Sequence, residues 1–128
     1  MTFFKHHIFT ILTLLLITAL SLMPAQEFPQ VDVQFADKWA HWLMYGFLSL
    51  VMGAELIIYR RHKWSSKQFV TRFLLIFLFS SIYGGVMELA QAFLTSTRHG
   101  DWMDFLANSF GAFCAYIILC GVSCKLKN

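Results

Sequence analysis

The chain contains 128 residues, of which 58% are hydrophobic and 13% are charged, and its mean hydropathy is +0.60. A soluble domain of this length needs more polar surface, so the composition indicates a membrane protein. The net charge of +3 does not indicate a nucleic-acid partner, because membrane topology and anionic lipid headgroups account for where the basic residues gather.

Four apolar stretches follow one another along the chain, at residues 8–23, 39–59, 69–93 and 105–122. Each approaches the ~20 residues that an α-helix needs to cross ~30 Å of hydrocarbon. We therefore predict an all-α integral membrane protein, a four-helix transmembrane bundle that forms a single domain over residues 1–128. The first stretch also fits a cleavable signal peptide ending near Ala25, because a basic residue precedes it and a small residue follows.

The basic residues are distributed unevenly between the connections. Eight of the ten Lys and Arg residues lie before the first stretch, in or next to the connection between the second and third, or after the fourth. By the positive-inside rule, these segments and both termini are cytoplasmic, and the loops 24–38 and 94–104 face outward. We thus expect a multi-pass protein of the bacterial inner membrane. The three cysteines lie in or beside the last stretch, so no extracellular disulfide is expected.

The second stretch is entered from outside through a group of polar residues. Asp37, Lys38, His41 and Tyr45 project from about one third of the helix surface at 3.6 residues per turn. Because an ionisable group facing lipid is costly, these side chains are expected to face the bundle interior or a hydrated cavity.

Matching polar residues occupy the outer ends of the third and fourth stretches. Glu88 and Gln91 lie three residues apart, Asp104 and Asn108 lie four apart, and Arg98 stands in the loop between the two stretches. Such spacings place each pair on one helix face. Small residues on the same faces should let the third and fourth helices approach closely, namely Gly84, Gly85, Gly111 and Ala115. We therefore predict an outward-open polar pocket walled by the last three helices.

The order and spacing of these motifs resemble the signature of the VanZ-like family of small membrane proteins. The similarity runs from about residue 35 to residue 116, although Thr95-Ser96-Thr97 stands before Arg98 where relatives often have a proline. The family takes its name from an accessory protein of glycopeptide resistance that lowers sensitivity to teicoplanin. The resemblance thus implies a role in the cell envelope and a site built on these residues.

Proton transfer at a lipid headgroup is the chemistry that these residue types favour. His41 and Glu88 are candidate catalytic residues, with Asp37 orienting His41 and Asp104 orienting another partner. Lys38 and Arg98 would bind an anion such as a phosphate, while hydrogen bonds from Tyr45, Gln91 and Asn108 would fix the substrate. We expect transfer or hydrolysis at the headgroup of a membrane lipid or a lipid-linked cell-wall precursor.

Two other functions fit the same residues: a non-catalytic module that binds anionic lipid or a glycopeptide, and a structural accessory subunit of another membrane protein or of a homo-oligomer. Asp104 fits an N-cap of the fourth helix as well as a catalytic role, and Asp101 fits a solvated loop charge. Glu55 is expected to pair with Arg60 or Arg72 and to serve as a tether at the cytoplasmic surface rather than as a functional residue. A metal could use His41, Glu88, Asp101 and Asp104, but no pair has a recognised ligand spacing, so neither a metal nor a cofactor is predicted.

Overall fold

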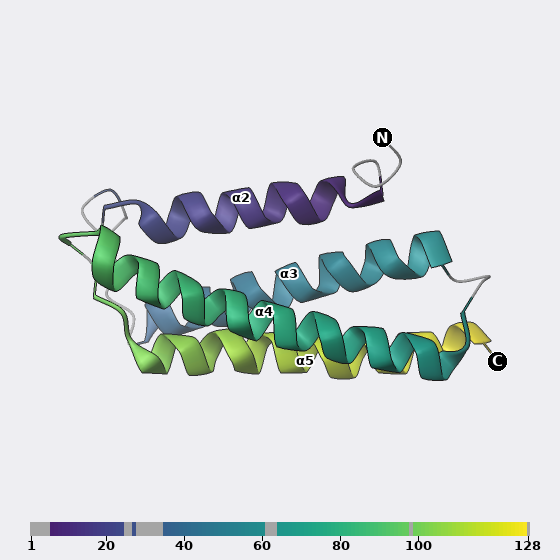
Figure 1. Ribbon diagram of the computed structural model, residues 1–128. Coiled ribbons are helices and arrows are strands. Elements are labelled where there is room, and N and C mark those ends of the chain that lie inside the picture. The colour runs from purple at the N-terminus through teal and green to yellow at the C-terminus, as the bar shows by residue number, and fades with distance from the viewer. Residues whose placement is uncertain (1–5, 25–26, 28–34, 61–63, 98, 128) are drawn as a thin grey trace.

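The computed structural model describes residues 6–24, 27, 35–60, 64–97 and 99–127. These residues form four α-helices in the order α2 (Ile8–Leu22), α3 (Ala36–Arg60), α4 (Ser66–Leu94) and α5 (Trp102–Lys127). The predicted all-helical fold and the four helical segments are confirmed. The helices run up and down in turn, so the start of α2 and the end of α5 lie at the same end of the bundle (Figure 1).

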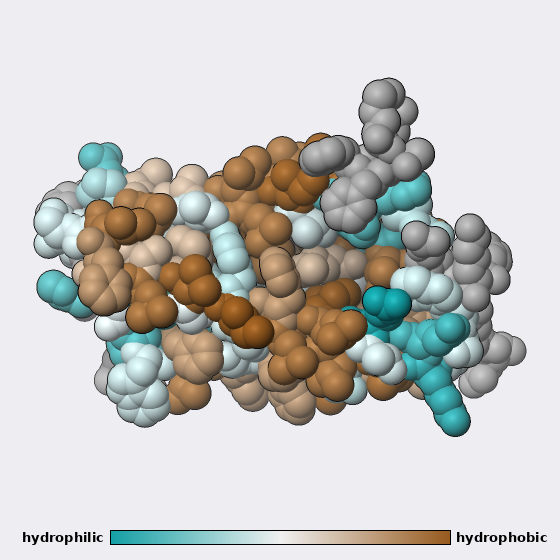
Figure 2. Space-filling model, in the orientation of Figure 1, coloured by the Kyte–Doolittle hydropathy of each residue, from teal (hydrophilic) through white to brown (hydrophobic). Residues whose placement is uncertain are grey.

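Three of the helices are long and apolar enough to cross a membrane: α3, α4 and α5. The shorter α2 has 15 residues, which at 1.5 Å per residue is about 22 Å, less than the ~30 Å of a hydrocarbon core. Many large apolar side chains on all four helices are exposed. On the face shown in Figure 2, apolar residues gather in the middle and polar residues toward both ends. This distribution is that of a membrane protein.

Local sequence explains where α4 begins. Ser65 and Gln68 form a capping box, in which the backbone N–H of Ser65 donates to Gln68 Oε1 at 2.8 Å and the Gln68 N–H donates to Ser65 Oγ at 3.4 Å. Two N–H groups at the helix end are thereby satisfied. The end of α4 is closed by Thr95, whose side-chain hydroxyl donates to the Gln91 carbonyl at 2.8 Å.

The centre of the bundle is the pair α3 and α5, which make the most extensive contact, and α4 packs mainly on α5. Gly111 makes the close approach between α3 and α5 possible, because a Cβ there would lie 2.1 Å from the Trp42 carbonyl oxygen. We expected Gly111 to serve the contact with the third stretch instead. The prediction is right for Gly84 and Gly85, which face Asn108 and Phe105 of α5.

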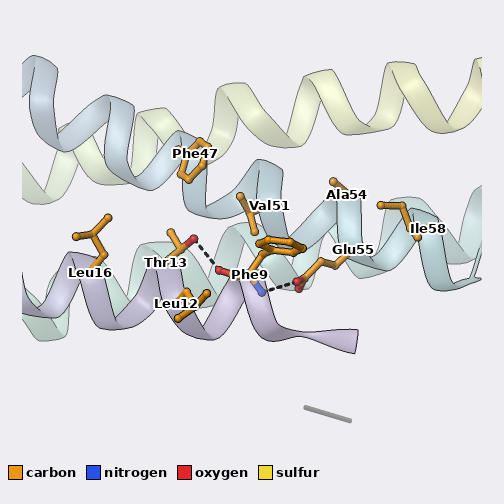
Figure 3. Close-up of a pocket in the computed structure, with 9 residues that line it drawn as sticks. All are labelled: Phe9, Leu12, Thr13, Leu16, Phe47, Val51, Ala54, Glu55 and Ile58. Carbon is orange, nitrogen blue, oxygen red and sulfur yellow. Dashed lines mark hydrogen bonds between the residues drawn. The ribbon is translucent and has the colours of Figure 1, made fainter. Parts of the chain in front are cut away.

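The peripheral helix α2 is attached to α3 and α4 by polar contacts. Glu55 on α3 accepts a hydrogen bond from the Phe9 N–H at 2.9 Å (Figure 3). It accepts another from the Thr10 hydroxyl at 2.7 Å. A carboxylate at the start of α2 satisfies N–H groups that the helix leaves unpaired and is favoured by the helix dipole. Backbone and hydroxyl donors at the start of α2 thus take the Glu55 oxygens in place of the expected Arg72. The side chain of Arg60, the other expected partner, lies outside the described part of the chain.

Candidate functional site

Polar side chains from three helices meet at one end of the bundle. The beginning of α3, the last turns of α4 and the beginning of α5 lie together there, at the left in Figure 1. They carry His41, Glu88, Asp104 and Asn108, all of which are buried. The helices run up and down in turn, and this arrangement brings His41 and Asn108 together although they are far apart in the sequence.

The His41 ring lies between two carboxylates. Its Nδ1 is 3.0 Å from Asn108 Oδ1 and 3.7 Å from Glu88 Oε1, while its Nε2 is 3.6 Å from Asp104 Oδ2. Because an amide oxygen can only accept, the short contact with Asn108 assigns a proton to Nδ1. In the neutral imidazole, Nε2 then carries a lone pair directed at the Asp104 carboxylate.

Lys38 is surrounded by three carboxylates. Its Nζ lies 2.9 Å from Asp37, 2.7 Å from Asp101 and 2.5 Å from Asp104. The predicted orientation of His41 by Asp37 is replaced by this pairing, since Asp37 is exposed and bonded to Lys38. The charge of Lys38 is therefore already balanced, and this lysine by itself provides little attraction for an anion.

Asp101 begins α5 and links it to α4. Its Oδ1 accepts from the Met103 N–H at 2.9 Å, and its own N–H donates to Glu88 Oε2 at 3.0 Å. The hydrogen bond from Lys38, together with the one from the Met103 backbone, lowers the pKa of the Asp101 carboxyl below its ordinary value. The cap of α5 is thus Asp101, which we expected to be a solvated charge, and the Asp104 side chain is left to face Lys38 and His41.

Gly100 holds this connection against α4. A Cβ at this position would lie 2.6 Å from the Glu88 carbonyl oxygen, so a larger residue would push the loop away from the helix. The close approach places the Asp101 N–H on the Glu88 side chain. Sequence reasoning missed Gly100, and it considered Asp101 only as a loop charge or a possible metal ligand. A glycine immediately before an aspartate at a helix start was the signal that could have identified them.

Two predicted substrate-binding residues make other contacts, and a third lies outside the described residues. Gln91 Nε2 donates to the Ser21 carbonyl at 3.0 Å and so ties the end of α2 to α4. The buried hydroxyl of Tyr45 has no hydrogen-bond partner among the described residues, and its ring packs beside Tyr83 with 6.1 Å between the centroids. Arg98 lies outside the described residues.

A cavity of about 460 Å³ opens beside the buried cluster. It is lined by Asp37, His41, Gln91, Thr97, His99, Gly100, Asp101 and Asp104. Another cavity, between α2 and α3, is lined almost entirely by apolar side chains around Phe9 and Phe47 (Figure 3). The first cavity therefore places several ionisable groups beside room for a polar ligand, whereas the second touches one ionisable group, Glu55.

Of the described residues, His41, Glu88 and Asp104 form a buried group that could hold a metal ion. Each offers one ligand atom, and these atoms all lie within 4.8 Å of one another. Glu88 Oε1 is buried and makes no hydrogen bond within the described part of the chain. A buried carboxylate oxygen without a partner costs free energy and calls for a proton or a cation.

Comparison of the chain with known families, proteins and structures identifies no relative. No model of a known protein family matches the chain, and neither a curated protein nor a solved structure is significantly similar to it. The function of the chain is therefore inferred from the geometry of its own residues.

Proposed function

We propose that the chain is a VanZ-like multi-pass protein of the bacterial inner membrane that acts on the headgroup of a membrane lipid or lipid-linked cell-envelope precursor. In this proposal α2 is a fourth span, both termini are cytoplasmic and the polar site faces the exterior. The distribution of basic residues supports this orientation. Lys67, Arg72 and Lys125 belong to the start of α4 and the end of α5, the end of the bundle opposite the site, and basic segments favour the cytoplasmic side.

One observation carries the proposal: His41 is buried between Glu88 and Asp104 beside an open cavity at one end of the bundle. Burying two carboxylates at the end of a membrane bundle is costly. Helix packing alone does not require buried carboxylates. Hydroxyl pairs such as Ser49 and Ser80, bonded at 2.8 Å, already join α3 to α4.

The three side chains converge on a point where a water molecule or a substrate hydroxyl would be held. Removing a proton from that water or hydroxyl would let its oxygen attack the headgroup phosphorus. The bond from phosphorus to the leaving oxygen would break and that oxygen would take up a proton, so that water gives hydrolysis and a substrate hydroxyl gives transfer. An imidazole held by a hydrogen bond through its other nitrogen is suited to such a step. In this proposal the end of the bundle that carries the site lies at the level of the lipid headgroups.

The test is the effect of Glu88→Gln on lipid-linked headgroups in membranes of cells that express the protein. We expect turnover of the affected headgroup to fall about 100-fold or more, the usual contribution of acid–base groups, while the protein still inserts and folds. Glu55→Gln is the matched control, because it changes a second buried glutamate of the bundle far from the site.

A non-catalytic role gives a different pattern. If lipid composition is the same with wild type and Glu88→Gln, the enzymatic proposal is wrong. Glu88→Gln protein that melts earlier in detergent and loses a co-purifying membrane protein would instead support a structural accessory subunit. Retained binding of anionic lipid or glycopeptide without turnover would support a binding module.

A further inference from the structure

We propose that His41, Glu88 and Asp104 bind a divalent first-row transition-metal ion, Zn²⁺ or Mn²⁺, through the imidazole Nε2 and one oxygen from each carboxylate. The three side chains are buried and their candidate ligand atoms lie within 4.8 Å of one another. An imidazole with two carboxylates suits these ions, and three protein ligands leave a coordination position open, as in catalytic zinc sites.

The contact between His41 and Asp104 has the separation of two ligands rather than that of a hydrogen bond. Its 3.6 Å between Nε2 and Oδ2 exceeds the ~3.2 Å limit of an N–H···O bond. Two ligand atoms each ~2.1 Å from a tetrahedral ion lie about 3.4 Å apart. With the proton on Nδ1, two lone pairs face each other here, and a cation between them removes the repulsion.

The hydrogen bond from His41 to Asn108 is the support that metal-binding histidines require. A ligating imidazole usually donates its other N–H to an oxygen, which fixes the tautomer and the orientation of the ring. Nδ1 makes this contact with Asn108 Oδ1 at 3.0 Å, and Asn108 is completely buried. The nitrogen that faces Asp104 is thereby prepared as a ligand.

A second, independent observation comes from Glu88. Its side chain is 8% exposed, and its two oxygens differ: Oε2 accepts the Asp101 N–H, whereas Oε1 has no hydrogen-bond partner among the described residues. Oε1 is also the oxygen next to the His41 ring, at 3.7 Å from Nδ1. One oxygen therefore anchors the carboxylate, and the other is directed into the cluster.

The charge balance of the site favours a cation. Glu88 and Asp104 are buried, and the only described lysine beside them, Lys38, shares its charge with Asp37 and Asp101 as well. Such a site repels a phosphate. A divalent ion would reverse the local potential and supply the attraction for an anionic headgroup that Lys38 does not provide. With the ion on Nε2, His41 would hold the ion instead of accepting a proton, and the ion would make the attacking water or hydroxyl more acidic. This use of the ion rests on the proposed function, whereas binding of the ion does not.

The decisive experiment titrates chelator-treated, detergent-purified protein with Zn²⁺ or Mn²⁺ alone, without lipid. We expect one equivalent to bind the wild type, and at least 100-fold weaker binding by Glu88→Gln and by Asp104→Asn. Asn108→Ala should weaken binding 10- to 100-fold, as loss of a supporting contact does. Glu55→Gln should bind as the wild type does.

Spin-echo spectroscopy of the Mn²⁺-loaded wild type needs no variant and should show coupling to an imidazole nitrogen. The proposal is overturned if the wild type binds neither ion, if no nitrogen coupling is seen, or if Glu88→Gln and Glu55→Gln lose binding equally. An ion bound without any effect on lipid headgroups would leave this site standing and refute the proposed function. Headgroup turnover by protein that binds no ion would refute the metal site and leave the proposed function standing.

Discussion

Gly111→Ala tests whether one backbone contact sets the geometry of the site. A Cβ at Gly111 would lie 2.1 Å from the Trp42 carbonyl oxygen and 3.1 Å from the Gly46 nitrogen. Both atoms belong to the backbone of α3, so no side chain can move aside. Because real Cβ contacts do not fall below 3.0 Å, α3 and α5 must separate by about 1 Å.

The matched control is Gly121→Ala, in the same helix, where an added Cβ meets nothing within 4 Å. Both substitutions share the gain in helix propensity from glycine to alanine, about 1 kcal/mol. The difference between them therefore isolates the steric cost. Overpacking of a filled interface costs about 1–3 kcal/mol, and we expect Gly111→Ala to be less stable than Gly121→Ala by this amount.

The assay is unfolding in detergent micelles, followed by the helical signal as denaturing detergent is added. The separation of α3 and α5 should also lengthen the His41–Asn108 contact of 3.0 Å and weaken binding of Zn²⁺. Equal stability and equal Zn²⁺ affinity of Gly111→Ala and Gly121→Ala would refute the close backbone packing of these helices and its role in the site.

Three further predictions concern contacts around the bundle. Glu55→Gln should destabilise the protein by about 1–2 kcal/mol, because a charged acceptor at the start of α2 is lost; faster hydrogen exchange at the Thr10 amide would report it, and unchanged exchange would contradict it. Ser65→Ala should cost about 1 kcal/mol by removing the cap of α4, measured by the same unfolding assay; a neutral result would show that the capping box adds nothing. Since the folded pKa of Asp101 is lowered, its contact with Lys38 stabilises the protein above the unfolded pKa of about 3.9. That stabilisation is lost as the pH falls through the folded pKa, so Lys38→Met should flatten the stability profile below about pH 4; a profile identical to that of the wild type would argue against the contact.

The sequence by itself determined the helices and the end of the bundle at which polar groups gather. Hydropathy over about 20 residues is a local property, so the four apolar stretches correspond to α2–α5 within a few residues. Up-and-down connection then follows from the short loops. It brings His41, Glu88, Asp104 and Asn108 to one level, as their positions near the helix ends predict.

The partner of each buried polar group was decided by the tertiary structure alone. Whether Asp101 or Asp104 caps α5 depends on where Gly100 meets α4, and the partners of Glu55 and Gln91 depend on where α2 packs. These partners depend on how helices that are distant in the sequence cross one another. The spacing of residues along one helix does not give the distances between residues on different helices. For the same reason, the close grouping of His41 with two carboxylates has no ligand spacing in the sequence and exists only in the folded bundle.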